Sequence, residues 1–227
     1  MATAGRKLSR KELRQPDWFQ IASENALEYF SLHKNLVFAV AGGVLVIGAI
    51  IWSWQIFKER QNIAASREFG KAMALYQSEK YPDAIAGFET VKGYRWSHYA
   101  VLAHLYLANS YLATNDTDKA VSEAQRSLAA TRPNSLYRQI ALVTLATAEE
   151  QRKDCKSAVQ HYNEAQNISG ALQSRAMLGK ARCAEQIGDT RSAVAAYKEY
   201  LKENPGSPLS VKLGELEAKS VMTPPGK

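Results

Sequence analysis

The sequence predicts an all-α protein: an N-terminal transmembrane helix, an α-solenoid of about four helical hairpins, and a C-terminal capping helix. Three observations predict this fold class. A run of nineteen residues, 36–54, contains no charged side chain. Small residues then recur at intervals of 35 to 38 positions through the rest of the chain. No stretch after the run shows the alternation of apolar and polar residues that is typical of strands.

The composition limits the classes of function. With 227 residues and 46% hydrophobic content, the chain can bury the core of one medium domain beside additional segments. Its net charge is +7, but residues 1–14 hold five Lys or Arg against one Glu, so this head alone carries +4. A nucleic-acid-binding domain concentrates Lys and Arg on its folded face. The C-terminal part of this chain is only mildly basic, and we expect no nucleic-acid partner.

The chain begins with a basic head, residues 1–15, and a segment of apolar residues at helical spacing, residues 16–34. Pro16 suits the first turn of a helix there. The segment is interpreted either as an amphipathic helix lying on a membrane or as a short juxtamembrane helix that packs against a partner. Its apolar members are Trp18, Phe19, Ala22, Ala26, Tyr29 and Phe30.

The uncharged run predicts a transmembrane helix over residues 35–57. Its nineteen residues span roughly 29 Å as a helix, close to the ~30 Å hydrocarbon core of a bilayer. Trp52 and Trp54 stand where interfacial aromatic residues are found, and Lys34 and Lys58 flank the run with charge. A cleaved signal peptide is the alternative, but signal peptides have a shorter apolar stretch and a shorter leader before it than this chain has. We therefore expect residues 36–54 to contact lipid.

The span also holds one pair of small residues, Ala39 and Gly43, at the spacing compatible with helix dimerisation, so a homo-oligomer is one alternative. No Pro or Gly separates Ile56 from Phe69. We therefore expect the spanning helix to continue into the first helix of the solenoid.

The solenoid, residues 58–219, is predicted from alanines in a fixed register. Ala84, Ala120, Ala158 and Ala193 are 36, 38 and 35 positions apart, and an alanine also stands twelve positions before each: Ala72, Ala108, Ala146 and Ala181. A larger residue follows four positions later in three of the four units. Small residues let two antiparallel helices approach closely, and stacked pairs then share one core. Residues 208–219 are expected to form the capping helix and residues 220–227 a disordered tail.

These units resemble the tetratricopeptide repeat. The stretch YPDAIAGF, residues 81–88, resembles the start of the second helix of that repeat, and Tyr111, Tyr162, Gly188 and Tyr197 stand at signature positions. The lengths of 36 and 38 depart from the usual 34 residues, and the signature tryptophan is absent. His104 stands at its position in the second unit, where we expect a packing role.

The layout of a basic head, one span and repeats resembles the YfgM-like family of ancillary subunits of the bacterial Sec translocon. Residues 30–35, the glycine-containing span and residues 64–72 carry this likeness. The resemblance implies an inner-membrane protein with a cytoplasmic N-terminus and a periplasmic solenoid. It also implies translocon subunits and a membrane-anchored periplasmic chaperone as partners.

The charges beside the span favour the opposite membrane orientation, with the solenoid in the cytoplasm. Within twenty residues the N-terminal side holds only Lys34, whereas the C-terminal side holds Lys58, Arg60, Arg67 and Lys71. The positive-inside rule applied to these residues places the solenoid in the cytoplasm. The cationic head could offset them if residues 16–32 lie on the membrane. We follow the resemblance and expect the solenoid outside.

The sequence shows no constellation typical of catalysis, of metal binding or of cofactor binding. Cys155 and Cys183 form no CxxC and no matched Cys/His pattern, which excludes a recognisable zinc site. Their helices are expected to be neighbours, so buried free thiols and a disulfide both stay open. We expect no enzyme, no metal and no cofactor.

The candidate site is a partner-binding groove lined by the first helix of each unit. Its N-terminal half is apolar and its C-terminal half carries two arginines, so a peptide could place an acid near Arg175 or Arg182. The alternative is a merely solvated surface. The candidate residues are Phe69, Met73, Tyr76, Asn109, Thr147, Gln151, Arg175, Arg182 and Gln186.

Two functions follow from these interpretations. The first is a membrane-anchored interaction protein that assists secretion or periplasmic folding near the translocon, as the resemblance implies. The second is a membrane-tethered scaffold or regulator for the assembly of another envelope complex. The proteins that co-purify with the chain distinguish the two.

Overall fold

The computed structural model describes residues 18–222, and these residues form ten helices and no strand. The predicted all-α fold is therefore confirmed. The expected basic head at residues 1–15, Pro16 and residues 223–227 of the expected tail lie outside the described residues. The chain divides into two compact units, Met1–Phe57 and Lys58–Lys227.

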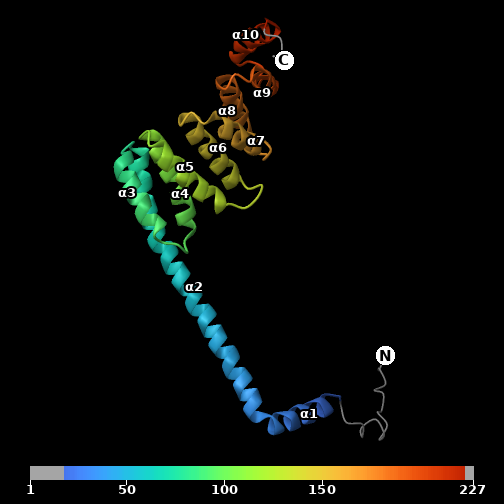
Figure 1. Ribbon diagram of the computed structural model, residues 1–227. Coiled ribbons are helices and arrows are strands. Elements are labelled where there is room, and N and C mark those ends of the chain that lie inside the picture. The colour runs from blue at the N-terminus through green and yellow to red at the C-terminus, as the bar shows by residue number, and fades with distance from the viewer. Residues whose placement is uncertain (1–17, 223–227) are drawn as a thin grey trace, which may run out of the picture. The chain divides into compact units, whose positions relative to one another are not determined.

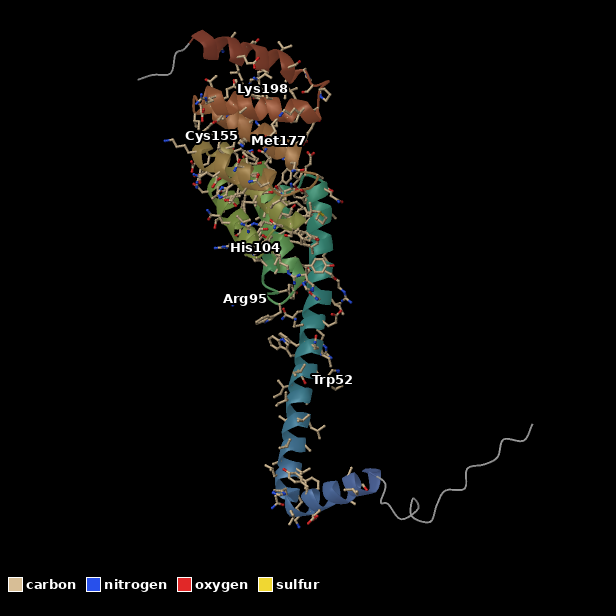
Figure 2. The ribbon with its side chains drawn as sticks, turned by 90° about the vertical axis from the view of Figure 1, so that its right-hand side faces the viewer. Trp52, Arg95, His104, Cys155, Met177 and Lys198 are labelled. Atoms are coloured by element: carbon tan, nitrogen blue, oxygen red, sulfur yellow. The ribbon has the colours of Figure 1, made fainter. Side chains whose placement is uncertain are left out.

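The first unit contains α1 (Trp18–Leu32) and the first part of α2 (Lys34–Gln77). A bend at His33 separates them, and the His33 ring stacks on Tyr29 with 4.5 Å between ring centroids. The apolar run lies within α2, which is long and apolar enough to cross a membrane. Its large side chains are exposed, among them Trp52 (Figure 2). The amphipathic pattern expected in α1 includes side chains outside the described set and stays a prediction.

The predicted continuity is confirmed, because α2 is one helix from Lys34 to Gln77. Its residues 58–77 form the first helix of the second unit and pair with α3 (Tyr81–Lys92). Three further hairpins follow, and Figure 1 shows them along this unit in chain order. They are α4 (His98–Ala113) with α5 (Thr117–Ala129), α6 (Leu136–Gln151) with α7 (Cys155–Gln166), and α8 (Gln173–Gln186) with α9 (Thr190–Glu203).

The last helix, α10 (Leu209–Met222), packs on α9 and so covers the end of the stack. It extends beyond Lys219, where we expected the capping helix to end and a disordered tail to begin. Leu216 from this helix is buried against Tyr197 and Ala196 of α9. A helix in this place shields the apolar face that the last hairpin would otherwise expose.

The alanines in register occupy the closest helix contacts. All eight are completely buried, with no exposed surface: Ala72, Ala84, Ala108, Ala120, Ala146, Ala158, Ala181 and Ala193. The larger residues four positions later, Phe88, Tyr162 and Tyr197, are also buried. Gly87 shows how tight the first contact is, since a Cβ there would come within 2.8 Å of the Ala72 Cβ. The register that predicted the hairpins is therefore the register of their packing.

The core is divided into four clusters rather than gathered at one centre. Each cluster draws its buried residues from three successive helices, beginning with α2, α3 and α4 and ending with α8, α9 and α10. Every hairpin is thus stabilised by its sequence neighbours, as in other solenoids.

One turn geometry joins the two helices of every repeat. Glu79, Asn115, Lys153 and Gly188 all have a positive φ, between 60° and 77°, and they share the spacing of the alanines. The residue after each donates its backbone N–H to a carbonyl in the last turn of the first helix, as Asp154 does to Glu149 O at 2.8 Å. This is the Schellman arrangement that ends many helices. The unusual repeat lengths therefore reside in the loops between repeats, residues 93–97, 130–135 and 167–172.

These turns yield a stability prediction with a built-in control. Lysine in a left-handed conformation is strained, so Lys153→Gly should stabilise the protein by about 0.5–1 kcal/mol. Gly188→Ala introduces the same strain in the next repeat and should destabilise it by about 1 kcal/mol. Urea unfolding of the full chain in detergent, followed by circular dichroism, measures both. A Lys153→Gly variant that is less stable than the wild type, or a Gly188→Ala variant that is more stable, would contradict the common turn geometry.

Candidate functional site

A pocket of about 240 Å³ opens across the first helices of three successive repeats. It contains three of the nine predicted groove residues, Asn109 from α4, Thr147 from α6 and Arg175 from α8. The residues that line it are Asn109, Leu112, Ile140, Val143, Thr144, Thr147, Leu172 and Arg175.

Helix α6 forms the floor of this pocket with one stripe of side chains. Ile140, Val143, Thr144 and Thr147 follow one another at steps of three, one and three residues, which places them on one helix face. The Thr147 hydroxyl donates to the Val143 carbonyl at 2.8 Å, and Thr147 Oγ1 lies 3.2 Å from the Tyr162 hydroxyl. The threonine side chain is therefore held in place by its own helix and by α7.

Arg175 supplies the charge at the rim of the pocket. It lies in the first turn of α8, is exposed, and forms no ion pair with any residue between Trp18 and Met222. The first turn of a helix also carries unpaired backbone N–H groups and the positive end of the helix dipole. A cation beside these groups favours a negatively charged ligand group next to an otherwise apolar pocket.

Arg182, the other predicted cation, is already paired. Its Nε and Nη2 donate to the two carboxylate oxygens of Glu150, both at 2.9 Å, and the Tyr162 hydroxyl also donates to Glu150 at 2.7 Å. The bond to Glu150 raises the pKa of the Arg182 guanidinium, and burial raises the pKa of the Tyr162 hydroxyl. This network links α6, α7 and α8. It leaves Arg182 engaged within the protein, whereas Arg175 is open.

The remaining predicted residues of the C-terminal half do not join the pocket. Gln186 accepts a hydrogen bond from the Cys155 thiol at 3.3 Å, and Gln151 is exposed at the end of α6. Cys155 and Cys183 are both free and buried in the core cluster of α6, α7 and α8. Burial, together with a hydrogen bond to Cys155, raises the pKa of the Cys183 thiol, so this sulfur is not an activated nucleophile.

Two of the predicted residues on α2, Phe69 and Tyr76, belong to an aromatic cluster rather than to the pocket. The Phe69 ring lies 5.3 to 5.5 Å from the rings of Phe88, Tyr99 and Tyr106, and Tyr76 also contacts Tyr106 at 5.4 Å. Met73 lies on the same helix and is half-buried, but it does not belong to this cluster. These rings join α2, α3 and α4.

The register of the alanines also places Leu112 and Val143 toward the groove, so sequence reasoning missed three residues of the pocket, Ile140, Thr144 and Leu172. For Ile140 a signal was present, since it stands six positions before Ala146 as Arg175 stands six positions before Ala181. Leu172 precedes α8 in a loop whose path depends on Gln139, which donates to the carbonyls of Ala165 and Ile168. No periodicity indicates that placement.

Two histidines of the solenoid hydrogen-bond to buried glutamates. His104, expected to fill the place of the signature tryptophan, hydrogen-bonds to Glu123 of α5, and His161 bonds to Glu149 at 2.7 Å. Burial raises the pKa of Glu123, but hydrogen bonds from His104 and Lys92 outweigh it and hold that pKa below its ordinary value. Among the described residues, no three His, Cys, Asp or Glu side chains are grouped to hold a metal.

The His161 pair predicts a pH dependence of stability. Its bond to Glu149 raises the pKa of His161 above 6.5. The protonated pair therefore stabilises the fold fully below about pH 6.5, and this contribution is lost as the pH rises through the native pKa. Urea unfolding of the full chain in detergent should show a smaller difference between about pH 5.5 and pH 8.5 in His161→Gln than in the wild type. His98→Gln, at an exposed position, is the control and should keep the wild-type difference; equal differences in all three would refute the pair.

Comparisons with known proteins agree with the repeat architecture. A family model for a tetratricopeptide repeat-like domain matches residues 28–218. The chain is also 27% identical over 187 residues to the ancillary SecYEG translocon subunit of Escherichia coli K12. That alignment covers 79% of this chain and 85% of the relative.

Proposed function

Since the chain belongs to the tetratricopeptide repeat-like domain family, we propose that it is a membrane-anchored module that binds other proteins near a Sec translocon. In this role it assists protein secretion or periplasmic folding and catalyses no reaction. The relative in Escherichia coli, an ancillary subunit of the SecYEG translocon, supports the location. The long apolar helix α2 supports the anchor.

The observation that carries the proposal is the pocket across α4, α6 and α8 with Arg175 at its rim. Leu112, Ile140, Val143 and Leu172 offer apolar contacts, and Asn109 offers a side-chain amide. This chemistry fits an extended or helical peptide segment with apolar side chains followed by one carboxylate. The partners proposed are translocon subunits and a membrane-anchored periplasmic chaperone.

The proposed compartment for the solenoid is the periplasm, with the N-terminus in the cytoplasm and α2 across the inner membrane. Lys58 and Arg60 next to the apolar run favour the opposite orientation. Large folded domains translocate largely regardless of such charges, so the relative weighs more here.

The absence of catalysis is proposed from the state of the polar groups. The buried Glu123 and Glu149 are hydrogen-bonded to His104 and His161, and Glu150 forms an ion pair with Arg182. The thiols of Cys155 and Cys183 are buried, and burial disfavours the reactive thiolate.

Capture of partners from native membranes in mild detergent tests the proposal. Full-length chain with an affinity tag should co-purify translocon subunits. Arg175→Glu should weaken this capture about ten-fold or more, because a charge-assisted hydrogen bond contributes about 1.5–3 kcal/mol. Arg191→Glu, the same charge change at an exposed position in α9, is the matched control and should leave capture unchanged.

Three outcomes separate the alternatives. Loss of translocon subunits in the Arg175 variant alone supports both the function and the pocket. Equal capture of translocon subunits by all variants supports the translocon as partner but shows that the pocket is not part of the interface. Capture of other envelope components without the translocon contradicts the proposal and favours the assembly scaffold.

A further inference from the structure

A second surface of the repeat unit lies at the end of the hairpins where the inter-repeat loops are. Two adjoining cavities of about 540 and 530 Å³ open there, and both are lined by Val101 and Ala130. They flank residues 93–97, between α3 and α4, and residues 130–135, between α5 and α6. We call this surface the basic loop face.

Large apolar side chains are exposed on this face. Trp96, Leu136 and Tyr137 are 52%, 55% and 56% exposed, respectively. Exposed Trp and Tyr beside basic residues are typical of surfaces that meet the interfacial region of a membrane, where one part of the ring is in apolar and another in polar surroundings.

Positive charge surrounds these side chains. The two cavities are lined by Lys92, Arg95, Arg126 and Arg132, and Arg95 and Arg132 form no ion pair within residues 18–222. The carboxylates of Glu89 and Glu123 pair with Lys92 and Arg126. These four basic side chains and two carboxylates leave an excess of two positive charges. The charges lie beside open cavities that are large enough to admit phosphate groups.

Among the loops at this end, only the first two contain a basic residue, Arg95 and Arg132, and only the first contains aromatic residues, Tyr94 and Trp96. The later loops at the same end, residues 167–172 and 204–208, contain neither a basic nor an aromatic residue. The turns at the other end of the hairpins hold four acids, Glu79, Asp116, Asp154 and Asp189, against three bases, Lys80, Arg152 and Lys153, and contain no aromatic residue.

The basic loop face also lies at the start of the repeat unit. The backbone N–H of His98 donates to the side chain of Asn62 at 3.2 Å, which attaches the first of these loops to the beginning of this unit. Figure 2 shows Arg95 at this end of the unit. Asn62 follows Trp54, the last residue of the apolar run, by only eight residues in the sequence.

We propose that the basic loop face binds the anionic headgroups of the bilayer in which α2 is anchored. Arg95 and Arg132 bind lipid phosphates, and Trp96 and Tyr137 enter the interfacial layer beside them. Lipid phosphates attract basic residues that lie within a Debye length of the surface, and interfacial aromatic rings add apolar contact. The inference rests on the proposed membrane anchor but not on the translocon.

The test uses the full chain in lipid nanodiscs, one set of phosphatidylcholine alone and one containing phosphatidylglycerol, followed by amide hydrogen exchange. Residues 93–97 and 130–135 should exchange several-fold more slowly in the anionic discs. The double variant Arg95→Glu/Arg132→Glu should lose this protection, whereas Lys156→Glu/Arg191→Glu, with the same charge change at exposed sites on α7 and α9, should keep it. Residues 167–172 and 204–208 should not differ between the discs.

The core of α6 provides the folding control, because its amides should stay equally protected in every variant. Equal exchange of the two loops in both discs, with the chain incorporated, overturns the inference and leaves the anchor standing. Failure of the chain to enter discs overturns the anchor and the inference together. Protection that appears only when translocon subunits are added overturns the inference in favour of a protein partner on this face.

Discussion

The close contact of paired helices at alanine is the constraint on which the rest of the structure depends. The eight alanines in register are fully buried, and the separation of the helix axes leaves no room for a longer side chain, as Gly87 against Ala72 shows. This contact repeats at nearly constant spacing, so successive hairpins stack with their first helices side by side. The pocket across α4, α6 and α8 exists because three such helices present the same face at adjacent positions. A substitution that separated one pair would therefore disturb the stack and the pocket alike.

Most of the fold could be predicted from this spacing, but the turns and part of the site could not. Gly188 and Asn115 are residues that tolerate a left-handed backbone, whereas Glu79 and Lys153 occupy the same turn without any sign of it in their chemistry. Asn109, Thr147 and Arg175 were predicted to face a groove and do line one pocket. Arg182 has the same helical spacing but does not line the pocket. It forms hydrogen bonds with Glu150, which lies 32 residues earlier in the sequence. Periodicity gives the face of a helix; it does not tell which side chain of the next helix will reach across.

The polar groups inside the solenoid form networks rather than single pairs. The Glu123 carboxylate hydrogen-bonds to His104, Lys92 and Arg126, and the Glu150 carboxylate hydrogen-bonds to Arg182 and Tyr162. A buried carboxylate needs several donors because a single partner does not offset its loss of hydration. Since each network joins different helices, it also holds neighbouring repeats in one register. Arg175 at the pocket and Arg95 and Arg132 at the loops form no ion pair within residues 18–222, so they are available to partners on two separate surfaces.

The central claim, an anchored interaction module that serves exported proteins, requires the pocket to lie outside the cytoplasm. Protease treatment of cells whose outer envelope is opened while the inner membrane stays sealed tests it most directly. We expect the protease to digest the solenoid, residues 58–219, and to leave a cytoplasmic control protein intact. Protection of the solenoid until detergent dissolves the inner membrane would contradict this account. It would place the pocket in the cytoplasm, in agreement with Lys58 and Arg60 beside the span.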